Sequence, residues 1–230
     1  MTVYAFIFAR GGSQGLPHKN IKLLGGIPLI AHSIKMAQQV DAVKKVYVST
    51  DSDDIAAVAA SYSAEIIKRP PELATSTAPE WLAWQHAIAF LKAKGEFFDV
   101  FLSLPATSPL RIKVDVEECL KRLTDDTDVV ITVTPSSRSP YFNMVIREES
   151  GECRLVNDGS VYNRRQDVPC TYDITTVAYA LRPSYILEKN SLLSGRVNSV
   201  VVPKHRAVDI DDAFDFMVAE TLFAHQNKSC

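Results

Sequence analysis

A cluster of glycines and cations follows the first apolar run of the chain, in the stretch AFIFARGGSQGLPHKN at residues 5–20. Gly11, Gly12 and Gly15 let backbone N–H groups approach an anion closely. Arg10 and Lys19 supply the positive charge that a triphosphate requires. The stretch predicts a phosphate-binding loop, and an ordinary glycine turn with two solvated cations is the open alternative. Neither the G-x-G-x-x-G dinucleotide pattern nor the Gly-Lys-Ser/Thr of a P-loop is present.

Two aspartates near the end of the chain form the second chemical pattern, in VDID at residues 208–211. If this segment is a strand, the spacing of Asp209 and Asp211 points both carboxylates to the same side. Two oxygen ligands facing one way suit Mg²⁺, which takes its remaining ligands from water and phosphate. The alternative is acidic capping of the helix that follows, a role that Asp212 fits.

The elements that must position these residues alternate along the chain up to residue 134. Short apolar runs predict strands at 3–9, 45–50, 64–67, 100–104 and 129–134, and helical spacing predicts helices at 28–40, 53–63, 80–94 and 114–123. Such alternation favours an α/β fold, with a mostly parallel sheet covered by helices on both faces. Ligands of such sheets bind beyond the carboxyl ends of the strands, which is where the glycine loop lies.

The alternation breaks after Pro135. Residues 136–171 hold turn formers and polar residues without a long helical period, which indicates an excursion from the sheet, such as a small arm. Returning strands are expected at 178–181 and 197–202. The last helix is expected at 212–226, with acidic residues in its first turn.

Composition and charge exclude several classes of protein. The net charge is -2, so we expect no binding to nucleic acid or to an anionic membrane. No apolar run reaches the roughly 20 residues of a membrane helix, and the N-terminus lacks the pattern of a secretory signal. The 4 cysteines include no Cys-x-x-Cys pair, so neither a zinc site nor a disulfide framework is indicated. We therefore expect a reduced, cytoplasmic protein.

Five stretches in order resemble one enzyme family. They are ARGGSQGLPHKN at 9–20, STDSDDIAAVA at 49–59, KRPPELATSTAP at 68–79, PATSPLR at 105–111 and VDIDDAFDF at 208–216. Together they resemble the CMP-sialic acid synthetases, or acylneuraminate cytidylyltransferases, over nearly the whole chain. The resemblance implies a single Rossmann-like nucleotidyltransferase domain over residues 1–230, with a dimerisation arm at about 136–172. It also implies a homodimer that uses CTP and a nine-carbon keto-sugar acid.

The resemblance assigns the glycine loop to the phosphates of CTP. The implied nucleotide-binding residues are Arg10, Gly11, Gly12, Ser13, Gln14, Lys19, Asn20, Arg69, Ser76 and Thr77. Gln14 is a departure, because the family commonly has Lys there, and Gln offers a hydrogen bond without a charge. Arg69, Ser76 and Thr77 would lie near the cytosine. The alternative is that Arg69 is a surface cation and that residues 76–77 form a helix N-cap.

The resemblance also implies the catalytic chemistry. The anomeric hydroxyl of the sugar acid would attack the α-phosphorus of CTP, and pyrophosphate would leave. Arg10, Lys19 and Asp211 are the expected catalytic residues, and Asp209 and Asp211 would hold Mg²⁺, with Mn²⁺ as the alternative ion. Positioned cations would stabilise the charge that develops on the phosphoryl oxygens.

A sugar pocket and a partner subunit complete the expected site. The implied sugar-binding residues are Pro105, Thr107, Arg165, Gln166, Tyr172, Asp173 and Thr175, and Arg165 would act across the dimer interface. Sialate enzymes of bacteria often have Gln, Arg and Asn where Pro105, Asp173 and Thr175 stand. At these three positions, and in SPYFNMV at 139–145, the sequence resembles relatives that activate legionaminic acid more than it resembles those sialate enzymes.

Two alternatives stay open at this point. The CMP-octulosonate (KDO) synthetases share the fold and reaction, but PATSPLR and RRQDVP favour the sialate-type branch. A catalytically silent nucleotide-binding module is the alternative from another class, and Gln14 is the change that favours it. Retention of Arg10, Lys19, Asp209 and Asp211 argues against it.

Overall fold

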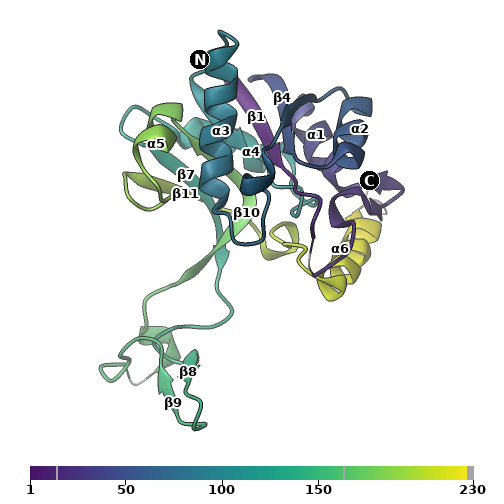
Figure 1. Ribbon diagram of the computed structural model, residues 1–230. Coiled ribbons are helices and arrows are strands. Elements are labelled where there is room, and N and C mark those ends of the chain that lie inside the picture. The colour runs from purple at the N-terminus through teal and green to yellow at the C-terminus, as the bar shows by residue number, and fades with distance from the viewer. Residues whose placement is uncertain (14, 163, 227–230) are drawn as a thin grey trace.

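The short apolar runs of the sequence form the strands of a central sheet. In the computed structural model, which describes residues 1–13, 15–162 and 164–226, this sheet has seven strands in the order β11-β7-β10-β6-β1-β4-β5 (Figure 1). The strands are β1 (Val3–Phe8), β4 (Val43–Thr50), β5 (Glu65–Lys68), β6 (Val100–Ser103), β7 (Val129–Pro135), β10 (Tyr172–Leu181) and β11 (Val197–Val201). The predicted α/β fold with a mostly parallel sheet is confirmed.

Strand β10 runs against the direction of the rest of the sheet. It pairs antiparallel with β6 on one side and with β7 on the other, whereas β1 pairs parallel with β4 and β6. Its register against β7 shifts between Thr175 and Tyr179. At this shift the Ala178 N–H donates to Thr132 Oγ1 at 3.2 Å, and the Thr175 hydroxyl donates to the same oxygen at 2.7 Å. A shift of this kind bends a strand and turns its side chains.

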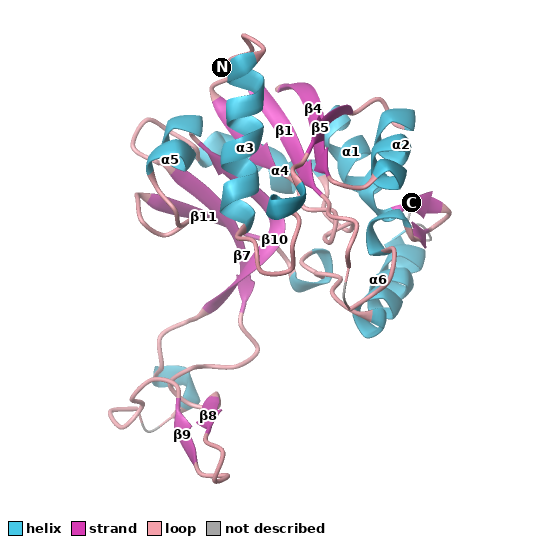
Figure 2. Ribbon diagram, viewed as in Figure 1, coloured by secondary structure: helices cyan, strands magenta, loops and turns pink. Residues whose placement is uncertain are grey.

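Helices cover both faces of the sheet, and each face has its own core (Figure 2). On one face α1 (Leu29–Gln39), α2 (Asp53–Ser61) and α4 (Lys113–Arg122) pack aliphatic side chains against the strands. On the other face α3 (Glu80–Ala93) and α5 (Pro183–Glu188) pack against an aromatic cluster. The ring centroids of Phe6 and Phe101 in that cluster lie 4.3 Å apart.

The last helix, α6 (Ala213–Gln226), packs beside the glycine loop rather than on the sheet. Phe216 and Ala219 of α6 pack with Leu24, Leu29 and Ile210 in a third cluster. Short elements lie nearby and in the loops: β2 (Leu23–Leu24), β3 (Ile27–Pro28), η1 (Lys19–Ile21), η2 (Pro71–Leu73) and η4 (Lys204–Arg206). Within the described residues, no helix has the length and apolar character needed to cross a bilayer.

The segment between β7 and β10 projects away from the sheet, as predicted (Figures 1 and 2). It contains a small hairpin of β8 (Val145–Arg147) and β9 (Cys153–Leu155), and the short helix η3 (Arg165–Asp167). The ladder between β7 and β10 continues to the pair of Pro135 and Tyr172. Strand β10 therefore begins earlier than predicted, because its first half lies in the two-stranded stem of this arm.

Three local features differ from what the sequence suggested. Residues 208–211 do not form a strand, so strand geometry does not set the direction of the two aspartates. Ser76 and Thr77 do not cap a helix, because α3 begins after Pro79 without a side-chain cap. Helix α5, which begins at Pro183, was not predicted.

The predicted capping role of Asp212 is confirmed. Its Oδ1 accepts hydrogen bonds from the backbone N–H groups of Phe214 at 2.8 Å and Asp215 at 3.0 Å. Asp215 Oδ2 accepts in return from the backbone N–H groups of Asp211 at 3.0 Å and Asp212 at 3.1 Å. This reciprocal pattern fixes the chain at the start of α6, and with it the position of Asp211.

Candidate active site

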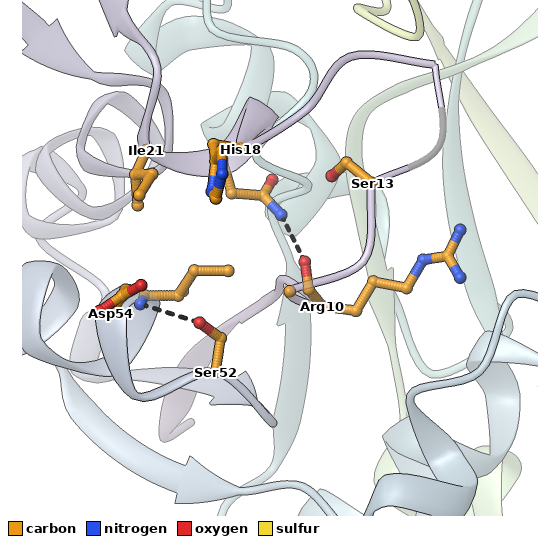
Figure 3. A pocket seen from close by; sticks show the side chains of 9 residues that line it. Arg10, Ser13, His18, Ile21, Ser52 and Asp54 are labelled. Atoms are coloured by element: carbon orange, nitrogen blue, oxygen red, sulfur yellow. Dashed lines mark hydrogen bonds between the residues drawn. The ribbon is translucent and has the colours of Figure 1, made fainter.

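The glycine loop is held in shape by hydrogen bonds at both of its ends. Asn20 is buried, and its side-chain amide donates to the carbonyl oxygen of Arg10 at 3.1 Å. The Gly11 N–H donates to Asp51 Oδ1 at 3.0 Å. Figure 3 shows the small pocket behind this loop, with the side chain of Arg10 extending away from it. That pocket has a volume of about 20 Å³, which is room for a single water molecule rather than a ligand.

The loop lies directly against the acidic segment at 208–212. A methyl group on Gly15 would lie 2.4 Å from the carbonyl oxygen of Asp211, so the contact requires glycine. Lys19 strengthens it, because its ammonium donates to the carbonyl oxygen of Ile210 at 2.6 Å and to Asp211 Oδ1 at 3.2 Å. Residues almost two hundred positions apart therefore form one surface.

Two adjoining cavities open onto this surface. One has a volume of about 440 Å³, and its wall includes Arg10, Ser13, Gly15, Lys19 and Asn20. The other has a volume of about 360 Å³ and reaches from the ends of β1 and β6 to the middle of β10. Both are lined by Phe8, Arg10, Thr107 and Asp211, so they form a continuous cleft. Each volume lies in the range of small-ligand sites.

The two aspartates of VDID both face the cleft, although they are not on a strand. The Asp209 Oδ1 atom is buried and has no hydrogen-bond partner among the residues that the structure describes. The Asp211 side chain is 79% exposed. An unpaired buried carboxylate oxygen is costly, so Asp209 is a candidate to bind a ligand in the cleft. No cluster of three or more His, Cys, Asp or Glu residues suited to a metal occurs in the described ranges.

Arg69 lies in the wall of the cleft and is buried at the end of β5. Its Nε donates to Ser49 Oγ at 3.1 Å, and Nη2 donates to the Ser49 carbonyl oxygen at 2.6 Å. The guanidinium lies 5.5 Å from the ring centroid of Phe8. Burial lowers the pKa of Arg69, and the carboxylates of Glu80 and Asp51 oppose that effect. Arg69 is thus a fixed cation with a well-defined orientation.

Arg111 supports the cleft from beneath. It is fully enclosed and donates to Ser33 Oγ at 2.6 Å, to Thr176 O at 3.3 Å and to the carbonyl oxygen of Pro105. Burial lowers the pKa of Arg111 to about 9, so it stays charged at neutral pH. Pro105 and Thr176 line the cleft, which makes Arg111 a positioning residue for its wall.

Most, but not all, of the predicted nucleotide-binding residues line the cleft. Arg10, Ser13, Lys19, Asn20, Arg69 and Ser76 line the cleft, and Gly11 lines the small pocket behind the loop. Gly12 and Thr77 do not line the cleft. Gln14 is outside the described residues.

The predicted sugar residues are split between the cleft and the arm. Pro105 and Thr107 line the cleft. Gln166 is exposed in the arm, Tyr172 is exposed on its stem, and Asp173 Oδ1 accepts a hydrogen bond from Ser136 Oγ at 2.5 Å. Thr175 is buried against Thr132. The side chain of Arg165 is outside the described residues.

Among the cleft residues that were not predicted are Glu80, Thr176 and Tyr179. Residues three positions apart point to opposite sides of a regular strand, and the register shift in β10 brings Thr176 and Tyr179 to the same cleft. Burial, Glu80 and Asp209 raise the pKa of the Tyr179 hydroxyl, so it stays protonated. Glu80 follows a proline in the first turn of α3, a position usually explained by the helix dipole alone.

The chain is similar in sequence to known proteins over most of its length. The family model for cytidylyltransferases matches residues 4–179. The chain is 33% identical over 228 residues to the CMP-N,N'-diacetyllegionaminic acid synthase of Campylobacter jejuni, covering 97% of this chain and 95% of that protein. It is 30% identical to the N-acylneuraminate cytidylyltransferase of Escherichia coli, covering 98% of this chain and 53% of that protein.

A solved structure supports the same fold. CMP:2-keto-3-deoxy-manno-octonic acid synthetase in complex with CTP superposes with a TM-score of 0.74 at 17% identity, covering 98% of this chain and 100% of that one. The family match and the similarity over nearly the full length agree with the family resemblance seen in the sequence. They are also consistent with the glycine loop and the cleft. The chain belongs to the cytidylyltransferase family, whose members are nucleotidyltransferases.

Proposed function

We propose that this protein activates a nine-carbon 2-keto sugar acid of the N-acylneuraminate type with CTP, giving the CMP-sugar and pyrophosphate. The observation that carries the proposal is the continuous cleft, in which Arg10 and Lys19 face Asp209 and Asp211. Cations for a triphosphate and carboxylates for a metal ion are thereby combined in one site. Residues 1–230 would act as a single catalytic domain with an arm at about 136–172.

The triphosphate would lie along the glycine loop. Lys19 has two oxygen partners, Ile210 O and Asp211 Oδ1, and its side chain is 13% exposed, so it is already positioned. Arg10 lines both cavities and can reach phosphates from the opposite side. Preorganised cations of this kind stabilise the charge of the transition state without reorganisation.

The donor set fits a divalent metal ion such as Mg²⁺. Asp209 offers a buried carboxylate oxygen without a partner in the described part of the chain, and Asp211 offers an exposed carboxylate. Hard oxygen donors are the ligands that Mg²⁺ prefers, and phosphates and water supply the rest of its shell. When bound, the ion would neutralise phosphate charge in the cleft.

The reaction exchanges a phosphoanhydride bond of CTP for a phosphodiester bond to the sugar. The anomeric oxygen forms a bond to the α-phosphorus, the bond from that phosphorus to the bridging β-phosphate oxygen breaks, and pyrophosphate leaves with the electron pair. The hydroxyl proton needs a base in the cleft. Asp211 is the exposed carboxylate beside Lys19 and Thr107, and we propose it for this role.

The proposed sugar is a legionaminic acid rather than plain N-acetylneuraminate. The relative from Campylobacter jejuni is named for diacetyllegionaminic acid, and Pro105 at the cleft offers no side-chain donor for a sugar hydroxyl. The alternative substrate is 2-keto-3-deoxy-manno-octonic acid, for which the similar solved synthetase is named. We also propose a reduced, cytoplasmic compartment, because the spacing of the cysteines indicates no disulfide framework.

We further propose that the arm joins two copies of the chain. Apolar side chains are exposed along it and its stem, namely Phe142, Met144, Val145, Ile146, Leu155, Val156, Val161, Tyr172 and Ile174. Exposed apolar side chains in such number are typical of an interface. Gln166 lies in the arm and not in the cleft wall of its own chain. Arg165 and Gln166 would therefore reach the sugar site of the partner.

Pyrophosphate release from CTP tests the proposed reaction, with N-acetylneuraminate, diacetyllegionaminate and the octulosonate KDO as acceptors. We expect the highest kcat/KM with diacetyllegionaminate. Asp211→Asn should lower kcat by about 100- to 1,000-fold, and the matched variant Asp41→Asn, on a surface carboxylate paired with Lys113, should not. Absence of release with all three acceptors would refute the proposal, and a preference for KDO would reassign the substrate.

A mixing experiment tests the arm. Light scattering should show a dimer, and Asp211→Asn and Arg165→Ala chains, each inactive alone, should regain part of the activity when mixed. Mixed dimers would combine an intact cleft from one chain with an intact arm from the other. A monomer at assay concentration, or no recovery on mixing, would contradict the shared site.

A further inference from the structure

Asp115 and Arg206 form an ion pair to which the proposed reaction gives no role. Arg206 donates through Nε to Asp115 Oδ2 at 3.0 Å and through Nη2 to Asp115 Oδ1 at 2.8 Å. The side chains are 20% and 4% exposed, and no other ion pair between described residues has both partners so well buried. Neither side chain lines the cleft, so any effect of the pair on the site must pass through the backbone.

Arg206 lies in the stretch that connects the sheet to the acidic segment. Near the start of this stretch, the Val202 N–H donates to the carbonyl oxygen of Val133 in β7 at 2.8 Å. Arg206 ends η4 four residues later, and Asp209 follows after three more. Residues 207–210 belong to no helix or strand, so no ladder of the sheet sets the position of Asp209.

The residues on either side of Asp209 are bonded to the loop that follows β6. The Ser108 hydroxyl donates to the carbonyl oxygen of Val208 at 3.2 Å, and the Ile210 N–H donates to the carbonyl oxygen of Thr107 at 2.9 Å. Both are single hydrogen bonds between uncharged groups, which are weaker than bonds that involve a charge. These two bonds place the segment beside the cleft, and stronger contacts lie beyond them on each side.

Charged contacts hold the segment on both sides of these bonds. Downstream, the Lys19 ammonium donates to the carbonyl oxygen of Ile210 at 2.6 Å. Upstream, Arg206 holds η4 against α4, and its two bonds to one carboxylate fix orientation as well as distance. Asp115 is itself fixed, because its Oδ2 also accepts from the Ile112 N–H at 3.1 Å at the start of α4. The first turn of α4 is therefore the upstream anchor of the acidic segment.

The Asp209 carboxylate needs such an anchor, because its buried Oδ1 atom has no hydrogen-bond partner among the described residues. An unpaired buried oxygen is unfavourable until a ligand binds it, and a loosely held segment would turn it toward solvent. The charged contacts on both sides oppose that turn. Desolvation offsets much of the attraction within a buried ion pair, so stability alone is a weak reason for a pair at this position.

We propose that Arg206 is a positioning residue that, through its ion pair with Asp115, holds Asp209 where it binds the metal ion. The inference rests on the proposed metal site and adds the device that keeps its buried carboxylate in place. The planar guanidinium is essential, because a lysine ammonium cannot form two parallel bonds to one carboxylate. Groups that orient metal ligands from outside the coordination shell typically change metal affinity or activity by about 10- to 100-fold. Arg206 acts through three residues of backbone, so we expect the lower end of that range.

Arg206→Lys is the test, because lysine keeps the charge and loses the paired bonds. Two metal constants are measured: the Mg²⁺ concentration for half-maximal pyrophosphate release, and the Kd of Mn²⁺ from electron paramagnetic resonance of the protein without substrates. We expect both to rise about 10-fold, whereas a purely structural role would lower the Tm and leave both constants unchanged. The matched control is Arg196→Lys, the same exchange on an arginine that has two bonds to Asp128 and lines a different pocket. It should keep the metal constants of the parent protein.

Binding of Mn²⁺ alone separates this inference from the proposed reaction. If no sugar acid is turned over but Arg206→Lys weakens Mn²⁺ binding, the reaction fails and the role of Arg206 stands. If turnover is as proposed and both metal constants change by less than about twofold, the role of Arg206 is refuted. Absence of Mn²⁺ binding to the unmodified protein would refute it as well. Asp115→Asn should weaken metal binding in the same way, and the double variant should lose no more than either single one; Asp115→Asn gives the readout if Arg206→Lys does not fold.

Discussion

Replacing Gly15 by alanine perturbs the contact that joins the glycine loop to the acidic segment. The added methyl carbon would lie 2.4 Å from the Asp211 carbonyl oxygen and 3.3 Å from its carbonyl carbon. Both are backbone atoms, so rotation of a side chain cannot relieve the overlap. Gly15 is not among the glycines with positive φ, and the cost of the exchange is therefore steric.

The size of the effect follows from the overlap. Ordinary contact begins at 3.4 Å, so the loop and the segment must separate by about 1 Å. Overpacking of this kind costs about 1–3 kcal/mol, and each kcal/mol lowers the Tm of a chain of this length by roughly 2–4 °C. Lys19 is bonded to Ile210 and Asp211 across the same contact. A displacement of about 1 Å in such a group can lower the rate by about 100-fold.

Thermal unfolding by circular dichroism and kcat/KM for pyrophosphate release measure the two effects. Gly12→Ala is the control for folding, because a methyl group there meets nothing within 4 Å, and we expect its Tm to stay the same or rise slightly. If Gly15→Ala keeps both the Tm and the kcat/KM of the parent protein, the loop does not depend on its contact with Asp211, and the reasoning fails.

Three further outcomes are expected. Arg111→Lys should lower the free energy of unfolding in urea by about 2–4 kcal/mol, because lysine cannot satisfy the acceptors around Arg111; a change under about 0.5 kcal/mol would contradict its supporting role. Burial raises the pKa of the Cys119 thiol to about 12, so at pH 8 alkylation mapped by mass spectrometry should modify the exposed Cys153 and Cys170 and spare Cys119 until the protein unfolds. Replacing residues 136–171 by a two-residue turn should give a folded chain with native-like circular dichroism. Light scattering should show that this chain is monomeric, and a dimer formed without the arm would show that the arm is not the interface.

The parts of the fold that could be predicted are those encoded by local pattern. The apolar runs before residue 135 became strands, and the helical spacings between them became α1 to α4, because each pattern matches one face of an element buried on the sheet. Helix α5 was missed because its six residues are too few to show a helical period. The start of β10 was missed because Tyr172, Asp173 and Ile174 are exposed in the arm stem and lack a buried face.

The cleft could be predicted only where a loop carries a distinctive composition. The loop from Arg10 to Lys19 can be recognised by its glycines and cations, and the acidic segment can be recognised by its paired carboxylates. Glu80 and Tyr179 belong to a helix and a strand whose patterns are explained by packing alone. Their place in the cleft depends on the start of α3 after Pro79 and on the register shift in β10, and neither is visible in a local pattern.

The ladder pair of Pro135 and Tyr172 has a consequence for how such proteins can diversify. The chain leaves the sheet at Pro135 and returns to it at Tyr172, and these two residues are paired in the ladder. The residues between them therefore form a single loop closed by this pair, outside the core. The entropy cost of closing a loop grows only slowly with its length. Arms of different length and sequence can therefore be accommodated beyond this pair of residues without altering the sheet that carries the cleft.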